Sequence, residues 1–527
     1  MRSAISPNWN VRKTVVRGAG GIVAAQNSRA AAVGAGVLRA GGNAVDAAVA
    51  TSFALAVSEP WMSGLGGGGY MLIWLAAVRT FHAIDFGMVA PQALDPADYP
   101  LGGTPAGDIV FGWPGVVDDR NLLGPLSIAV PGHVDGVGLA LERFGTKPLA
   151  EALAGAIALA EQGLGVDWFA ALHISVAARG LSRFAESRAT WLPGGFPPGP
   201  DWEGQGKGLP LGSLPETLRT IAAEGRRSFY EGRLADGIAA DIEALGGKLT
   251  RDDLARYRAR MIDPVTTTHG GSTIAAVSGL TAGPGLIRCL EEMKAPVSGI
   301  APDAATFAAY ADIFRRVNHE RMETVGDSDE KRSPSCTSHL SVIDRAGNMV
   351  SLTQTLVSIF GSKVMLPRSG IMMNNSIMTF DPRPGRPNSI GPGKRPLANM
   401  CPMLATRDGR AHFALGASGG RRIMPAVVQV ADFLTRFGMT LDAAFEQPRI
   451  DSSGTELVTM DPRLPHPIRA ALASRFQTAE RPPGVYPMTY ACPSAVRLDA
   501  DGMREGTSDF MHPWADAVAE NTPIDTR

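Results

Sequence analysis

Two threonines at the ends of a short hairpin pattern have the spacing for nucleophilic chemistry. Apolar-rich runs on either side of residues 345–348 are typical of two antiparallel strands and a tight turn. A turn centred on Ala346 pairs Thr337 with Thr355, which brings two hydroxyls together. One interpretation is an ordinary Thr–Thr pair on a sheet face. The other is that cleavage after Cys336 frees the α-amine of Thr337, which then accepts the proton of its own hydroxyl. The spacing leaves both open.

A second candidate nucleophile is Ser418 in the GxSxG pattern of residues 416–420. An apolar strand pattern leads in and an apolar helix pattern leads out, as a nucleophile elbow requires. His466 or His512 would then be the base. Alternatively, the glycine amides at a helix N-terminus form an anion or oxyanion hole without serine chemistry.

The glycines of residues 64–69 form a literal GxGxxG motif. A dinucleotide site needs a strand before this motif and a helix after it, so that the pyrophosphate meets a helix N-terminus. Here a helical pattern comes first and the apolar run Tyr70–Leu75 follows. The order favours a structural glycine turn.

Helical and loop patterns surround these motifs. Residues 27–57 predict two small-residue helices with a break at Gly41-Gly42, and residues 215–258 predict two helices around the segment GGKLT, with Thr250 as a cap. Further helices are expected within 138–180, 302–323 and 423–437. Pro and Gly content predicts loops at 101–125, 190–214 and 381–396.

Composition excludes several functions. The 527 residues hold 50 Lys and Arg against 51 Asp and Glu, so we expect no nucleic-acid partner. No apolar run reaches about 18 residues and no signal-peptide core is present, which predicts a cytoplasmic protein without a membrane segment. The four cysteines and nine histidines are scattered. We therefore expect no metal and no cofactor.

Many ordered segments together resemble one family. The chain is similar over nearly its whole length to the γ-glutamyltransferase family of N-terminal-nucleophile (Ntn) hydrolases. The resemblance rests on GGNAVDAAVA (41–50), EPWMSGLGGGGYML (59–72), PGHVDGVGLAL (131–141), FYEGRLADGIAADI (229–242), GGKLTRDDLARY (246–257), TSHLSVIDRAGNMVS (337–351), GIMMNN (370–375), KRPLANMCP (394–402) and GASGGRRI (416–423).

The resemblance implies an α+β fold, the αββα sandwich of Ntn hydrolases. It implies a precursor that cuts itself between Cys336 and Thr337 into a large chain, 1–336, and a small chain, 337–527, which stay associated. Thr355 matches the family's supporting threonine, and Gly419 and Gly420 match its oxyanion-hole glycines. Ser418 then has no nucleophilic role.

The residues that hold a γ-glutamyl group in the family are replaced. No arginine occurs between Arg79 and Arg120, and Gly87 and Pro96 stand at the aligned positions. Other headgroup positions are also changed: they hold Val357, Ser376, Thr379, Ala398 and Asn399. A buried carboxylate without its arginine loses a charge-assisted pair, which predicts a changed substrate.

The expected activity is hydrolysis of a small acyl amide, similar to oxamate, with Asn399, Ser376 and Thr379 as hydrogen-bonding groups beside Val357. Arg395 and Arg421 are candidate carboxylate anchors or structural residues. Divergent relatives such as oxamate amidohydrolase and glutaryl or cephalosporin acylases have altered acyl pockets. A γ-glutamyl hydrolase or transferase, and an unprocessed binding protein, are the alternatives. His339 is expected to make structural hydrogen bonds, because the amine of Thr337 already supplies a base.

Overall fold

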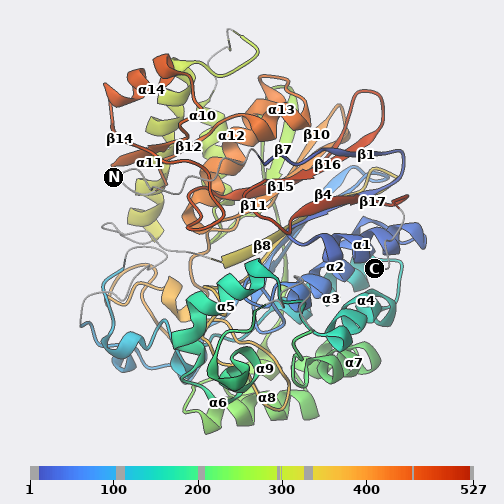
Figure 1. Ribbon diagram of the computed structural model, residues 1–527, viewed down its shortest axis with the longest axis vertical. Coiled ribbons are helices and arrows are strands. Elements are labelled where there is room, and N and C mark those ends of the chain that lie inside the picture. Colours follow the sequence, from blue (N-terminus) through green and yellow to red (C-terminus); the bar gives the residue numbers. More distant parts are fainter. Residues whose placement is uncertain are drawn as a thin grey trace.

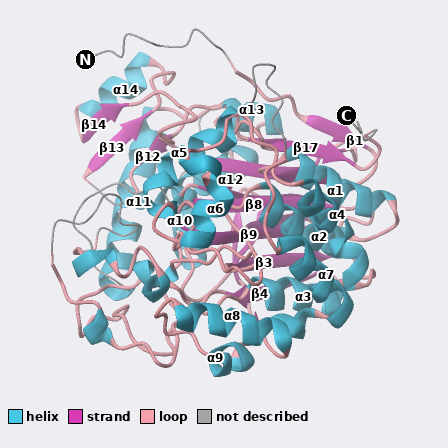
Figure 2. Cartoon of the chain, turned by 60° about the horizontal axis from the view of Figure 1, so that its bottom comes forward, coloured by secondary structure: helices cyan, strands magenta, loops and turns pink. Residues whose placement is uncertain are grey.

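Two antiparallel sheets stacked face to face, with helices outside them, form the frame of the molecule. The computed structural model describes residues 11–102, 113–199, 208–293, 297, 299–325, 336–453 and 456–522. In Figure 1 helices α1 to α9 lie below the strands and α10 to α14 lie above them. Figure 2 shows the strands enclosed between these helices. The arrangement is the expected αββα sandwich.

The first sheet has seven strands in the order β17-β2-β8-β9-β3-β4-β5. Its neighbouring strands pair antiparallel throughout. Their bounds are β17 Asp516–Ala519, β2 Ile22–Ala25, β8 Cys336–Ile343, β9 Met349–Val357, β3 Gly68–Leu75, β4 Thr80–Phe86 and β5 Arg260–Ile262. The expected 337–355 hairpin lies at its centre as β8 and β9.

The second sheet also has seven strands, in the order β1-β16-β15-β11-β10-β7-β6. They are β1 Val16–Gly18, β16 Arg504–Ser508, β15 Cys492–Leu498, β11 Arg410–Ser418, β10 Met403–Arg407, β7 Ser272–Ala276 and β6 Val265–His269. A small separate sheet joins β12 Ile450–Asp451, β13 Leu457–Met460 and β14 Gln477–Glu480.

Nine of the described helices pack on the first sheet. Apolar residues of each of these helices share one buried cluster with residues of β2, β3, β8 and β9. The helices are α1 Ser28–Arg39, α2 Ala44–Ser58, α3 His133–Phe144, α4 Leu149–Gln162, α5 Trp168–Leu181, α6 Ala185–Trp191, α7 Leu214–Glu224, α8 Arg233–Ala244 and α9 Arg251–Arg256. Small residues in α1 and α2 allow these two helices to lie close together.

The remaining described helices cover the second sheet. Their apolar side chains form a second buried cluster with residues of β7, β10, β11 and β15. They are α10 Gly283–Glu292, α11 Ala304–Val325, α12 Ile423–Thr435, α13 Leu441–Glu446 and α14 His466–Ala473. The helix expected over 302–323 is α11, and the one expected over 423–437 is α12.

One prediction about the helices is wrong in number. Residues 215–258 hold three α-helices, α7, α8 and α9, where the pattern predicted two. Gly225 and Gly232 have positive φ values of 84° and 77°, and this backbone interrupts the helix between α7 and α8. The expected cap at Thr250 is confirmed, because its side chain and Asp253 form a capping box at the start of α9.

The loop prediction for 381–396 is confirmed, whereas 101–125 and 190–214 also contain short 3₁₀ turns, at Val117–Asp119 and Pro193–Gly195, and α6 extends to Trp191. Residues 381–396 contain no helix or strand. In the 101–125 and 190–214 loops, residues 103–112 and 200–207 lie outside the described part of the chain. Among the described residues, none of the helices has both the length and the apolar character to cross a membrane.

Candidate functional site

The β8–β9 hairpin has the register expected from its sequence as far as Ser338, the neighbour of Thr337. Ser338 pairs with Gln354 and Ile343 with Met349, which confirms a turn centred on Ala346. The register then shifts, because Cys336 pairs with Val357. Thr337 therefore lies at a β-bulge, a device that re-aims a side chain at a strand end.

The partner strand is irregular at the same place. Val357 ends β9 with a positive φ of 84°, which is rare for a β-branched residue. Its backbone N–H donates to Oγ1 of Thr355 at 2.7 Å. The two threonines therefore lie where both strands of the hairpin depart from regular pairing, and such strain is often found at functional sites.

Thr337 and Thr355 line one small cavity. Its volume is about 40 Å³, roughly three times the ~10–15 Å³ that one water requires. The walls come from β3, β8, β9, the 3₁₀ turn Ser376–Thr379 and the segment before β10. The lining residues are Tyr70, Gly87, Met88, Thr337, Thr355, Val357, Ser376, Thr379, Pro396, Leu397, Ala398, Asn399 and Met400. We call this space the threonine cavity.

The positions whose side chains depart from the family pattern meet in this cavity. Gly87, Val357, Ser376, Thr379, Ala398 and Asn399 all line it together with the two threonines. Pro96 does not line it and begins a 3₁₀ turn instead. The described lining residues include neither a carboxylate nor a basic side chain. A substrate ammonium group would therefore find no charged partner among them.

Two polar atoms in the threonine cavity have no partner among the described residues. The hydroxyl of Ser376 and Nδ2 of Asn399 are both buried and unpaired. Leaving such a group unpaired costs about 1–3 kcal/mol in the free protein. Both groups can donate a hydrogen bond, so they fit an acceptor oxygen in the cavity.

Sequence reasoning missed Arg321, which lies directly behind the cavity wall. Its Nη1 donates to Oδ1 of Asn399 at 3.0 Å and its Nη2 donates to the carbonyl of Ala398 at 2.5 Å. No described carboxylate lies within 4 Å of Arg321, and its Nε has no described partner. Burial lowers the pKa of Arg321 to about 10, so the guanidinium stays charged at neutral pH. A helix pattern was expected here, but no motif marked this residue.

The glycine turn of residues 64–69 allows the chain at the start of β3 to pack closely against β9. A Cβ on Gly67 would lie 2.2 Å from the carbonyl oxygen of Thr355, so only glycine fits. Helix α2 precedes these glycines and strand β3 follows, in the order expected for a structural turn. The GxGxxG motif therefore has a steric role, because its glycines allow the chain to pack against Thr355 beside the threonine cavity.

A buried polar chain lies behind Thr337, on the helix side of the first sheet. Ser338 donates to Oε2 of Glu59 at 3.1 Å, and Ser63 donates to the hydroxyl of Ser338 at 3.1 Å. Nε2 of Gln354 donates to the Ser63 hydroxyl at 2.9 Å. Nε2 of His512 lies 3.1 Å from Oε1 of Glu59, and both side chains are fully buried. This network fixes the residue next to Thr337.

His339 makes structural hydrogen bonds, as the sequence indicated. Its two ring nitrogens each lie 2.9 Å from a hydroxyl, that of Thr353 and that of Ser341. Burial lowers the pKa of His339 to about 3, so the ring is neutral at physiological pH. A Cβ on Gly416 of β11 would lie 2.3 Å from this ring, which shows how closely the sheets meet.

Gly419 and Gly420 follow β11 directly and begin the turn into α12. Their φ values of 135° and 63° favour glycine. They do not line the threonine cavity. Ser418, the residue before them, accepts a hydrogen bond from Nε2 of Gln26, and Oε1 of Gln26 accepts from the backbone N–H of His339 at 3.3 Å. The oxyanion role of the two glycines stays a prediction.

Neither histidine that was expected as a base for the serine elbow lies at Ser418. The strand–turn–helix order around Ser418 is as expected, but the Ser418 hydroxyl is fully buried against Gln26. His512 contacts Glu59, and His466 begins α14 on the surface. Neither histidine is positioned to activate Ser418.

Arg395 and Arg421, which were candidates for carboxylate anchors or for structural roles, are not among the described residues that line the threonine cavity. Nη1 of Arg395 donates to the carbonyl of Gly87 at 2.5 Å and lies 3.3 Å from Oδ1 of Asp85. Arg421 lies in the turn after Gly420, where its charge acts on the buried Asp451. Among the described residues no group of three or more His, Cys, Asp or Glu side chains is placed to hold a metal ion.

Comparisons with known proteins identify relatives over nearly the whole chain. The family model described as gamma-glutamyltranspeptidase matches residues 30–336 and 318–518. The Acylase ACY 1 proenzyme of Pseudomonas sp. (strain SE83) is 34% identical, over 98% of this chain and 95% of the relative. The glutathione hydrolase proenzyme of Escherichia coli (strain K12) is 30% identical, over 82% of this chain and 81% of the relative.

Solved structures are similar as well. The cephalosporin acylase from Bacillus halodurans has a TM-score of 0.84 at 25% identity, covering 98% of this chain and 99% of that one. The Helicobacter pylori gamma-glutamyltranspeptidase has a TM-score of 0.50 at 28% identity, covering 62% of this chain and 88% of that one.

Proposed function

We propose, on the premise that this chain belongs to the γ-glutamyltranspeptidase family, that it hydrolyses a small amide whose acyl group carries a carboxylate, as oxamate does. The chain is a hydrolytic Ntn enzyme of that family, with a precursor that yields a large and a small chain. The identity of the acyl group is our proposal.

The catalytic residue we propose is Thr337. Cleavage of the Cys336–Thr337 peptide bond frees the α-amine of Thr337, which takes the proton of its hydroxyl as Oγ1 attacks the amide carbonyl. The tetrahedral oxyanion is stabilised by backbone N–H donors, a role we assign to Gly419 and Gly420. The C–N bond breaks, the leaving amine takes the proton, and water then hydrolyses the acyl-threonine ester.

The observation that carries the choice of acyl group is the partly buried contact between Arg321 and Asn399. Because Arg321 holds Oδ1 of Asn399, the amide NH₂ of Asn399 is left for the cavity, where Nδ2 is buried and unpaired. The Ser376 hydroxyl is a second unpaired donor in the same space. Two donors backed by a cation that pairs with no described carboxylate fit a carboxylate better than a neutral or cationic group.

The size and charge of the cavity support a short acyl chain over a γ-glutamyl group. A γ-glutamyl headgroup carries an ammonium as well as a carboxylate, and none of the described lining residues is acidic and able to pair with the ammonium. The volume of about 40 Å³ accommodates only a few heavy atoms beyond the reacting carbonyl.

The experiment is a substrate panel with the processed protein. Ammonia release from oxamate, succinamate and glutaramate is compared with release from the neutral amides acetamide and butyramide, and γ-glutamyl-p-nitroanilide is the third class. We expect kcat/KM to be at least about tenfold higher for an anionic amide than for a neutral one of similar length. Saturable turnover of the γ-glutamyl anilide, with glutathione as a competitor, would contradict the proposal. The Thr337→Ala protein, which lacks the proposed nucleophile, is the inactive control.

A further inference from the structure

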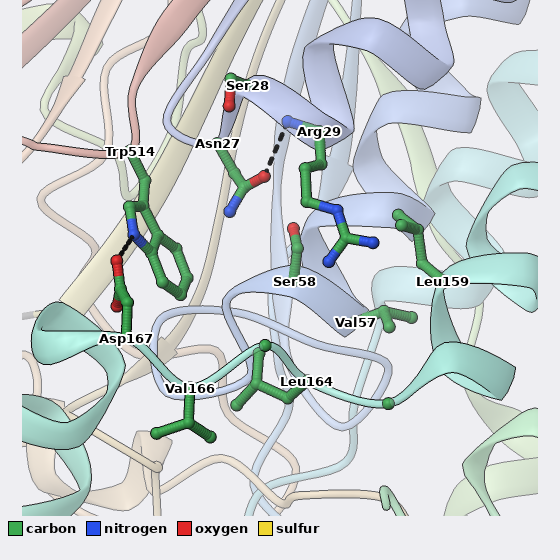
Figure 3. Close-up of a pocket in the computed structure, with 12 residues that line it drawn as sticks. Asn27, Ser28, Arg29, Val57, Ser58, Leu159, Leu164, Val166, Asp167 and Trp514 are labelled. Carbon is green, nitrogen blue, oxygen red and sulfur yellow. Dashed lines mark hydrogen bonds between the residues drawn. The ribbon is translucent and has the colours of Figure 1, made fainter. Parts of the chain in front are cut away.

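A second and larger cavity lies away from the threonine cavity. Its volume is about 270 Å³, and it opens between the start of α1, the end of α2 and the start of α5 (Figure 3). None of its lining residues lines the threonine cavity. We call it the Trp514 cavity; its lining includes Asn27, Arg29, Ser58, Leu164, Val166 and Trp514.

Two polar side chains of this cavity have hydrogen-bond donors that no described residue accepts from. Asn27 is 3% exposed, and its Oδ1 accepts from the N–H groups of Arg29 and Ala30 at the start of α1, while its Nδ2 has no hydrogen bond to a described residue. Ser58 is 6% exposed and its hydroxyl is likewise unpaired among the described residues. Figure 3 shows the Ser58 hydroxyl directed toward the side chains of Asn27 and Arg29.

Arg29 gives the Trp514 cavity a cationic group that pairs with no described carboxylate. Nη2 of Arg29 donates to the neutral Oε1 of Gln162 at 2.6 Å, and no described carboxylate lies within 4 Å of the guanidinium. The first turn of α1 adds the positive end of a helix dipole.

Asp167 is the acidic residue among the described lining residues, and both of its carboxylate oxygens already accept hydrogen bonds. Oδ1 of Asp167 caps α5 by accepting from the N–H groups of Phe169 and Ala170, and its Oδ2 accepts from Nε1 of Trp514 at 2.6 Å. Asp167 therefore holds the Trp514 ring in place, and it has its hydrogen bonds without a ligand.

The opposite wall is apolar. In Figure 3 the Trp514 ring lies on one side of the cavity with Val166 and Leu164 below it, and Val57 and Leu159 lie on the other side, near Arg29. A volume of about 270 Å³ is close to the lower end of the ~300–1,000 Å³ usual for small-molecule sites. The cavity thus combines a cationic, donor-rich edge with an aromatic and aliphatic wall.

We propose that the Trp514 cavity binds a small organic carboxylate with an apolar body. The carboxylate accepts hydrogen bonds from Asn27 Nδ2, the Ser58 hydroxyl and the Arg29 guanidinium. The apolar body packs on Trp514, Leu164 and Val166. This site is separate from the catalytic threonine, so it stands whether or not the proposed substrate is correct.

The test is calorimetric titration of the uncut Thr337→Ala protein and of the wild type with benzoate and hexanoate, with benzyl alcohol and hexanol as neutral counterparts. We expect one site that prefers the carboxylates in both proteins. Arg29→Gln should weaken carboxylate binding by about tenfold or more. Ser58→Ala should weaken it less. Arg179→Gln, an exposed arginine on α5 outside the cavity, is the matched control and should leave binding unchanged.

Three results would overturn the proposal: no binding by the wild type, equal binding of acids and alcohols, or binding that Arg29→Gln leaves intact. Competition by oxamate would also overturn it, because it would place the carboxylate in the threonine cavity. Arg29 is exposed, so its variant is expected to fold, and thermal unfolding of each variant checks this.

Discussion

Arg321 and Asn399 are joined by a 3.0 Å hydrogen bond from Nη1 to Oδ1, and this contact orients the amide of Asn399. With its oxygen held by the guanidinium, Asn399 presents its NH₂ group to the threonine cavity. Under the proposed function, a cation that lies outside the described lining thereby influences which acyl group the cavity accepts.

The Thr337→Ala variant should remain one uncut chain. Without the hydroxyl no ester intermediate forms at the Cys336–Thr337 bond, whereas the wild type should give two chains that break before Thr337. Thr337→Ser keeps both hydroxyl and amine and should still cleave, more slowly. Intact mass spectrometry measures each outcome. Thr266→Ala, on the exposed face of edge strand β6, is the control and should be cut like the wild type. A cut at any other bond would refute the assignment.

Ser418→Ala should keep cleavage and most of the hydrolytic rate. The Ser418 hydroxyl is buried and bonded to Gln26, so its loss should cost about 1 kcal/mol of unfolding free energy, without removing a nucleophile. The measurement is steady-state ammonia release together with intact mass. A loss of rate as complete as that of Thr337→Ala would instead support Ser418 as the nucleophile.

Arg321→Gln should reduce kcat/KM for anionic amides by about 10- to 150-fold, the value of a hydrogen bond to a charged group of about 1.5–3 kcal/mol. Turnover of neutral amides should change far less, because only the anionic acyl group depends on the buried charge. Arg395→Gln is the matched control, since Arg395 lies outside the cavity and pairs with Asp85. An equal loss for both substrate classes would indicate a purely structural role for Arg321.

Ser376→Ala should raise the unfolding temperature, or leave it unchanged, while weakening hydrolysis. The Ser376 hydroxyl is buried without a described partner, so its removal relieves a desolvation penalty of about 1–3 kcal/mol. Ser362→Ala is the contrasting control. Its hydroxyl donates to the carbonyl of Met373 at 2.9 Å, so this variant should be destabilised. Calorimetry measures the unfolding temperature of both variants. Destabilisation of Ser376→Ala to the same extent would mean that the hydroxyl has a partner in the free protein.

Stability should fall as the pH drops below about 6.5, the ordinary pKa of histidine. Burial lowers the pKa of His133 and His173 to about 4 and that of His339 to about 3. As the pH falls below 6.5, these histidines therefore bind more protons in the unfolded chain than in the folded chain. Their contribution is fully present above pH 6.5 and is lost progressively between 6.5 and 3.

The histidine prediction is checked by the slope of unfolding free energy against pH from 7 to 4. His339→Gln should show a smaller slope than the wild type, because one buried neutral ring has been removed. His466→Gln changes an exposed ring at the start of α14 and should keep the wild-type slope. A His339→Gln slope equal to that of the wild type would show that His339 does not contribute.

The amino-acid sequence by itself determined several of the elements and most of the central hairpin. Local patterns located α1, α2, β3, α11 and α12, because amphipathic or apolar periodicity and cap residues act within one element. The register from Ser338 to Ile343 followed from the position of one turn. Resemblance to a family also identified the positions that meet in the threonine cavity, including Val357, Ser376 and Asn399.

Only the tertiary structure decided which charges face which groups. Arg321 lies 78 residues before Asn399, and no spacing rule connects a helix of the second sheet to a loop beside the first. Arg395 and Arg421 were equally plausible anchors, but packing places both outside the threonine cavity. The bulge at Thr337 and the Trp514 cavity likewise arise where distant segments pack together. Side-chain environment depends on contacts between remote residues, whereas periodicity reports only on near neighbours.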